Sequence, residues 1–235
     1  MKSRICSIGN SIIICAFLVC PQVSLSGLAD FTSEKEQELL RYIEIFSGPF
    51  RMEQHVAAEA LAYTGISDQK LFDVIENQLL NNYKSISDSY DIDWASWLAK
   101  ALAFSGDKKY LGTLEVISRD ASQKKLRKYA KVAKKLQPKY EKWNKIIADN
   151  TEFLSEYSLA INRYSNMLNS DVPDLHKLAA KRIFFEGIDI PFMRDLVIYR
   201  IGSPAPNTDK DTKKWLKKSL CTSCKTFGSK SHWLK

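Results

Sequence analysis

The sequence lacks the short motifs that mark the commonest catalytic sites. It has no GxSxG elbow for an acyl-transfer triad and no glycine-rich loop for a phosphate group. Its three histidines, His55, His176 and His232, have neither HExxH nor HxH spacing. We therefore expect no catalytic residues, metal, cofactor or small-molecule substrate, and we expect packing or surface roles for the histidines.

Long apolar runs are scarce too. The run from Ile12 to Val19 follows two basic residues and is too short for a mature transmembrane helix, which needs about 20 apolar residues. This arrangement predicts a signal peptide over residues 1–26, with cleavage after Ser26 or as late as Ala29. The protein is therefore expected to be exported, to the periplasm or out of the cell.

Two alternatives would keep the N-terminus in a membrane. One is a lipoprotein acylated on Cys20, although Phe17, Leu18 and Val19 do not supply the small residue expected directly ahead of a lipidated cysteine. The other is an uncleaved N-terminal anchor.

Cysteine is rare in the rest of the chain. Three of the five cysteines would leave with the signal peptide, so only Cys221 and Cys224 remain, too few for a disulfide-stapled miniprotein. Their CxxC spacing leaves three states open. These are a local disulfide in an oxidising compartment, two free thiols, and a zinc site with His232, although structural zinc takes four ligands.

The alternation typical of β-strands is also absent, and helical periodicity fills the chain after residue 30. Ser33 and Glu36 have the spacing of a capping box at the start of the first helix. Gly65 stands where a glycine ends a helix. Asp93 is expected to open the helix that carries Trp94 and Trp97, and the tryptophans are expected in the core.

Helical spacing continues to residue 221. Pro138 is expected to kink or end the basic helix over residues 122–136, and Thr151 to cap a long helix through Leu168. Three further helices are expected at 172–186, 189–201 and 209–221. The sequence thus predicts an all-α fold.

An internal repeat relates two parts of the chain. A shift of 122 residues places Arg41-Tyr42 on Arg163-Tyr164, and a loop shortened by four residues then places Trp97 on Trp215. The repeat predicts two modules of helical hairpins, over residues 30–150 and 151–235. Such units bury their apolar faces by stacking, which predicts a short right-handed α-solenoid.

One stretch carries a family resemblance. Trp97 through Gly106-Asp107 to Leu114, followed by Ala121-Ser122 and by Leu126-Arg127-Lys128-Tyr129-Ala130 to Leu136, resembles a HEAT-type repeat. The two halves together resemble uncharacterised exported HEAT-like proteins of Gram-negative bacteria. The resemblance implies a solenoid that binds proteins, and it supplies no catalytic residues.

Positive charge is concentrated in one segment. The net charge is +8, or +6 without Lys2 and Arg4, yet residues 119–145 hold eleven Lys or Arg against Asp120 and Glu141. We predict a surface there for an acidic protein partner, lipid head groups or lipopolysaccharide phosphates. Nucleic acid would be attracted by the same physics, but an exported protein rarely meets it. The predicted surface comprises Lys124, Lys125, Arg127, Lys128, Lys131, Lys134, Lys135 and Lys139.

These observations favour a noncatalytic binding or scaffold module of the bacterial cell envelope, with a protein partner. Two alternatives remain. One is a small helical enzyme acting on an envelope polymer, which requires a deep pocket with a carboxylate of raised pKa. The other is peripheral binding to an anionic membrane through the basic helix.

Overall fold

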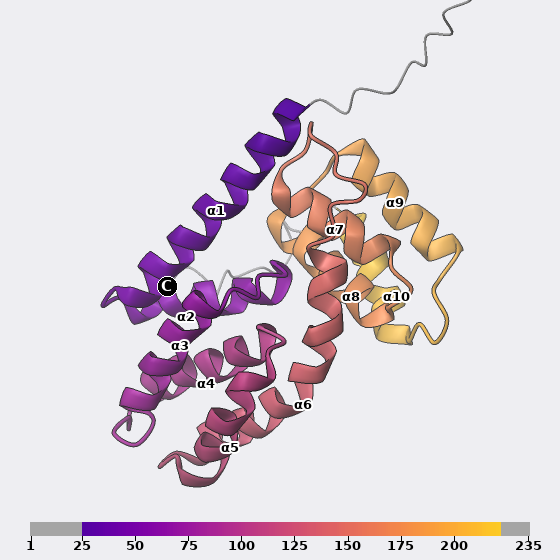
Figure 1. The fold of residues 1–235 in the computed structure, drawn as a ribbon. Coiled ribbons are helices and arrows are strands. Elements are labelled where there is room, and N and C mark those ends of the chain that lie inside the picture. The colour runs from indigo at the N-terminus through magenta and orange to yellow at the C-terminus, as the bar shows by residue number, and fades with distance from the viewer. Residues whose placement is uncertain (1–24, 222–235) are drawn as a thin grey trace, which may run out of the picture.

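The protein is all-helical, as predicted, in a computed structural model (Figure 1). The structure describes the backbone of residues 25–221 and the side chains of residues 33–221. These residues form ten α-helices and two short 3-10 helices, with no strand among them. Within this part of the chain, no helix is both long and apolar enough to cross a membrane. Cys20 and nearly all of the predicted signal peptide lie outside the described residues.

The helices follow one another through short connections. They are α1 (Leu25–Ser47), α2 (Arg51–Ala60), η1 (Leu61–Tyr63), α3 (Gln69–Asn82), α4 (Ser89–Phe104), η2 (Lys108–Tyr110), α5 (Leu111–Asp120), α6 (Lys124–Ile147), α7 (Leu159–Asn169), α8 (Pro173–Glu186), α9 (Pro191–Gly202) and α10 (Lys210–Ser219).

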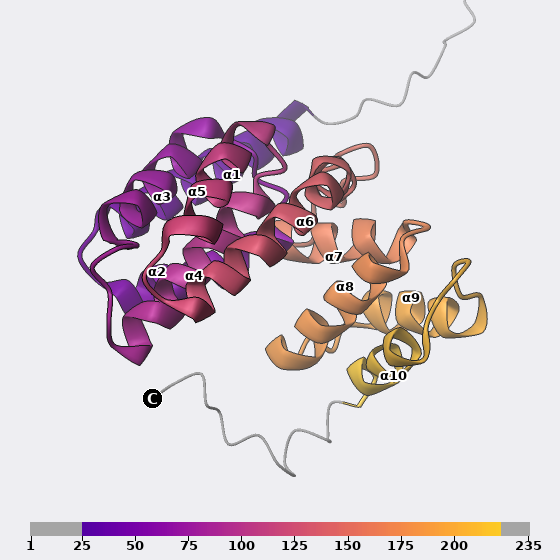
Figure 2. The same ribbon diagram turned by 90° about the horizontal axis from the view of Figure 1, so that it is seen from below.

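The same packing pattern occurs in two groups of helices. In the first group α1 packs on α3, and α2 packs on α4. In the second group α7 packs on α9, and α8 packs on α10. Helix α6 continues the first group by packing on both α4 and α5, and it also contacts α7. Figure 2 shows α1–α5 on one side of the molecule and α7–α10 on the other, with α6 between them.

Local sequence signals explain several helix ends. Asp68 caps α3 by accepting a hydrogen bond from the Lys70 amide at 2.8 Å, and Asp209 caps α10 in the same way. Gly65, Gly106 and Gly187 all have φ near +70°, the left-handed conformation in which glycine commonly ends a helix. The expected glycine stop at Gly65 is thus confirmed.

Two predicted helix starts are wrong. Helix α1 already begins at Leu25, so Ser33 lies inside it, and its hydroxyl accepts from the Gln37 side chain. Helix α4 begins at Ser89 because Asp88 accepts from the Asp91 amide at 2.9 Å and caps it earlier than Asp93 would. At the start of α4, Asp88 thus takes the capping role that the sequence pattern gave to Asp93.

The segment after α6 is the third correction, because Thr151 does not cap a helix. Its amide and hydroxyl both donate to Asp149 Oδ1, at 2.9 and 2.6 Å, in a turn that follows α6. The next helix, α7, begins only at Leu159, after Ser158. Asn162 holds the intervening loop. Its amide donates to the Leu154, Tyr157 and Ser158 carbonyls, and its oxygen accepts from the Leu154 amide.

Asn162→Ala should therefore destabilise the fold. The side chain is 5% exposed, and its removal leaves the Leu154 amide without its acceptor and the Tyr157 carbonyl without its side-chain donor, while the Leu154 and Ser158 carbonyls keep only their backbone donors. We expect a loss of about 2–3 kcal/mol in the free energy of unfolding, measured with urea. Asn169→Ala is the matched control, because that amide makes only one long contact, 3.4 Å to Ser165 Oγ. Equal losses in the two variants would refute the role given to Asn162.

The core is centred on α4, which is buried on most of its sides. Trp94 is 1% exposed, and its indole donates to Gln54 Oε1 at 2.8 Å. The buried amide of Gln54 donates in turn to the carbonyls that end α1, best to Gly48 at 2.8 Å. This bond network fixes the turn between α1 and α2 on the core, because a buried indole or amide without a partner would be costly.

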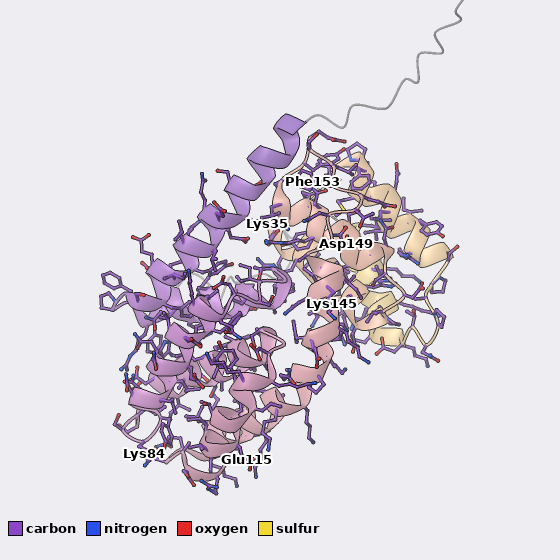
Figure 3. The ribbon with its side chains drawn as sticks, in the orientation of Figure 1. Lys35, Lys84, Glu115, Lys145, Asp149 and Phe153 are labelled. Carbon is purple, nitrogen blue, oxygen red and sulfur yellow. The ribbon has the colours of Figure 1, made fainter. Side chains whose placement is uncertain are left out.

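A buried ion pair joins the two groups of helices. Arg163 of α7 donates twice to the Glu38 carboxylate of α1, at 2.8 and 2.6 Å, and the Arg163 side chain is only 7% exposed. Nearby, Lys35 Nζ donates to Asn150 Oδ1 at 2.9 Å. Figure 3 shows Lys35 on α1 beside the segment that carries Asp149 and Phe153. Helix α1 thus contacts α2 and α3 of the first group and α7 of the second group.

Candidate functional site

The basic residues predicted to form a binding surface all lie on α6. Its apolar stripe, which includes Leu126, Ala130 and Ala133, is buried against α4 and α5. The helix is continuous through Pro138, so the expectation that this residue could end it is wrong. Buried contacts on both sides keep it helical. Gln137 donates to the Gly106 carbonyl at 2.5 Å, and Asn144 donates to the Phe104 carbonyl at 2.8 Å.

Half of the eight predicted basic residues already have partners within the fold. Lys125 pairs with Asp93 of α4, Lys134 with Glu115 of α5, and Lys139 with Asp174 of α8 at 2.8 Å. Arg127 donates to the carbonyls of Ala121 and Ser122 just before the helix. The three lysines thus link α6 to neighbouring helices with their charge compensated, whereas Arg127 is held by uncharged carbonyls of the turn before α6.

These contacts also show what three carboxylates near helix starts do. Asp93, which was expected to cap α4, pairs with Lys125 instead. Asp91 pairs with Arg51, and Asp174 pairs with Lys139. Each carboxylate joins one helix to another.

The other four basic residues form what we term the lysine stripe, which consists of Lys124, Lys128, Lys131 and Lys135. All four are exposed, and no acidic side chain of residues 33–221 pairs with them. Their spacing places them on one line along the helix, roughly 16 Å long at 1.5 Å per residue. This line lies opposite the buried stripe, so it faces straight out from the molecule.

The surface along the lysine stripe is open. A hollow of about 790 Å³ follows it, and Val132, which is 38% exposed, also lines it. All of its lining residues belong to one helix, so the hollow is a shallow surface and not an enclosed pocket. Such a surface suits contact with a large anionic partner better than capture of a small molecule.

Charge repulsion within the lysine stripe has a cost. Like charges three or four residues apart on a helix destabilise it by about 0.2–0.5 kcal/mol per pair. For this stripe, nothing in the described part of the fold offsets that repulsion. The stripe would be stabilised by an external anion, and its long-range field would attract one.

Sequence reasoning missed a second arrangement, in which a lysine lies between aromatic rings. Lys100 Nζ is 3.8 Å from the ring centre of Trp97 and 4.5 Å from that of Tyr129, and burial lowers the pKa of Lys100. Lys218 lies over one ring, 4.8 Å from the ring centre of Trp215. Trp94 and Trp143 are buried in the core, whereas Trp97 and Trp215 are half-buried and pack against it. The repeated Trp-x-x-Lys spacing was the available signal.

The histidines occupy packing positions where they are described. His176 is fully buried, its Nε2 lies 2.7 Å from the Ser170 carbonyl, and burial lowers its pKa. His55 lies against Trp97, with 5.7 Å between the ring centres, and burial lowers its pKa as well. His232 lies outside the described residues.

Several carboxyl groups have a lowered pKa. Hydrogen bonds from Lys109 and Tyr110 lower the pKa of Asp73, and hydrogen bonds from Thr151 lower that of Asp149. Such bonds stabilise the charged form, which is the opposite of what a general acid needs. Among residues 33–221, no group of three or more His, Cys, Asp or Glu is placed to hold a metal ion.

Cys221 lies two residues after the end of α10 and is disulfide-bonded. Cys224 lies outside the described residues, so the pairing of these two cysteines stays a prediction.

Comparisons of the chain with protein-family models, with curated proteins and with solved structures found no match.

Proposed function

We propose that the protein is a noncatalytic binding module of the bacterial cell envelope that holds an acidic protein partner on the lysine stripe of α6. One observation carries the proposal. Four exposed lysines lie in line on one helix without acidic partners in the described fold, while the other three lysines of the predicted surface pair with carboxylates of neighbouring helices and Arg127 donates to backbone carbonyls. Export to the envelope and the absence of catalysis rest on the sequence patterns alone.

We further propose that the scaffold is a short right-handed α-solenoid of HEAT-like type. The packing order supports this, because first helices of successive hairpins contact one another, as do second helices. These contacts are α1 on α3, α2 on α4, α4 on α6, α7 on α9 and α8 on α10. The recurrence of one pattern in both groups also supports the duplication of residues 30–150 in 151–235.

Helix α10, the last helix of the described residues, has the composition of a cap. In the repeat alignment Ala95 and Ala99 of α4, both fully buried, correspond to Lys213 and Lys217 of α10, both exposed. Lysines at these positions would resist the packing of a further helix. Terminal repeats of solenoids commonly carry such a polar outer face.

The test is photo-crosslinking from Val132, because this exposed residue lies beside the lysine stripe and its replacement by a photo-reactive amino acid leaves every lysine in place. We expect wild-type protein in its native host to give one dominant adduct with an acidic protein. The variant K124Q/K128Q/K131Q/K135Q should lose the adduct, since four exposed charge contacts of up to about 1 kcal/mol each would weaken binding tenfold or more. High salt should weaken it likewise.

A matched control removes the same charge elsewhere. The variant K210Q/K213Q/K214Q/K217Q takes four exposed lysines from α10 and should keep the Val132 adduct. Equal adducts in all three proteins, or none in any, would contradict the proposal. A different result would favour the membrane alternative. In that case wild-type protein would bind anionic vesicles, the α6 variant would not, and no protein adduct would form.

A further inference from the structure

A second surface lies between the first two helices of the first group, away from α6. We call it the α1–α2 groove. Its apolar floor includes Tyr42 and Ile45 of α1 and Met52 and Val56 of α2, and its volume is about 670 Å³. Unlike the hollow along the lysine stripe, two helices line it. A groove between two helices can therefore accommodate an elongated element such as a third helix.

Two of the residues that line this groove are exposed apolar side chains. Val56 is 55% exposed and Met52 is 49% exposed. They are two of the ten large apolar side chains that are exposed in the described chain. An exposed apolar pair within a groove between two helices indicates an interaction surface more strongly than scattered exposure does.

The second group of helices has an equivalent surface, and there its α7 side is covered. The 122-residue shift relates Tyr42 to Tyr164 and Ile45 to Met167, which are 3% and 0% exposed. On the α8 side, Met52 corresponds to Asp174, which is exposed, and Val56 to Leu178, which is half-buried. The cover is helical. Helix α6 packs on α7, its Lys139 pairs with Asp174 of α8, and Asn166 of α7 donates to the Asp149 carbonyl just after α6 at 2.7 Å.

Charge indicates which kind of helix would fit the open groove. Glu44 and Glu53 line it, are exposed, and make no ion pair with any described side chain. Arg41 also lines it, and Glu38 is already paired with Arg163, so the uncompensated charge is −1. An apolar helix face flanked by lysine or arginine would match both the floor and the two carboxylates.

We propose that the α1–α2 groove is a docking site for a basic amphipathic α-helix of a partner protein. The helix lies in the groove as α6 lies on α7 and α8, with its apolar side chains on Val56 and Ile45 and its cations near Glu44 and Glu53. This is the helix-in-groove mode of recognition, with anchors at helical spacing. The site is separate from the lysine stripe, whose partner is acidic.

The experiment uses a labelled peptide with the sequence of residues 133–149, the part of α6 that covers the equivalent surface in the second group. Fluorescence anisotropy should show binding to the whole protein with a Kd on the order of 10 μM, and a scrambled peptide of the same composition should bind at least tenfold more weakly. V56E should weaken binding of the native peptide at least tenfold, because it places a charge on the apolar floor. E44K/E53K should weaken it too.

V132E is the matched control, since it makes the same substitution at an exposed valine of α6, and it should bind the peptide like wild type. Absence of peptide binding, equal binding of the scrambled peptide, or equal binding by V56E and V132E would each overturn the proposal. The proposal for the α1–α2 groove and the proposal for the lysine stripe can be refuted independently. V56E should keep the Val132 photo-adduct, and the α6 glutamine variant should keep peptide binding.

Discussion

Gly106→Ala should be among the most destabilising single substitutions in this chain, with a loss of about 2–5 kcal/mol in the free energy of unfolding. Gly106 has φ +70°, which costs an alanine about 1–2 kcal/mol. A Cβ there would lie 2.7 Å from the Glu141 amide nitrogen, 2.8 Å from its Cα and 2.9 Å from the Tyr140 carbonyl carbon. These are backbone atoms of α6, so the whole helix would have to shift, at about 1–3 kcal/mol for overpacking.

The measurement is urea unfolding followed by circular dichroism, with Gly112→Ala as control. Gly112 lies in the first turn of α5, and a Cβ there would meet no atom within 4 Å. Alanine should stabilise that helix by about 0.5–1 kcal/mol, because it restricts the unfolded chain and favours the helix. The two glycine substitutions should thus change the free energy of unfolding in opposite directions. A neutral Gly106→Ala would mean that the close approach of α6 to this turn is not needed.

Glu38→Gln should cause the second large loss, about 3–5 kcal/mol. The substitution leaves the Arg163 guanidinium buried, with its side chain 7% exposed, and removes the only carboxylate that pairs with it within the described residues. Breaking one side of a buried pair costs far more than the pair contributes, because an uncompensated charge remains away from water. Hydrogen exchange should rise first in α7, where Arg163 lies.

Glu141→Gln is the matched control for this experiment. Glu141 pairs with Lys108 at 3.4 Å, and both side chains are exposed, at 43% and 72%. Such a surface pair contributes at most about 1 kcal/mol. The double variant E38Q/R163M should recover most of the stability, because it also removes the buried charge. Losses of similar size for Glu38→Gln and Glu141→Gln would show that the junction between the two groups of helices does not depend on this pair.

The basic residues of α6 show which part of the candidate site could be predicted from the sequence. Periodicity predicted a helix with a basic face, and the structure has that helix. The sequence could not show which lysines of this helix are paired within the fold, because the partners Asp93, Glu115 and Asp174 come from three other helices. Only packing brought those carboxylates within reach, so only the structure separates the lysine stripe from the lysines that tie helices together.

By itself, the sequence determined those features that depend on neighbours along the chain. These include the helical class and the glycine stop at Gly65, because each arises from residues within a few positions of one another. Tertiary structure decided the rest. The Trp94 indole met the Gln54 side chain across 40 residues, and Glu38 joined Arg163 across 125 residues. Contacts so distant in sequence form only when the helices pack, so no local pattern could predict them.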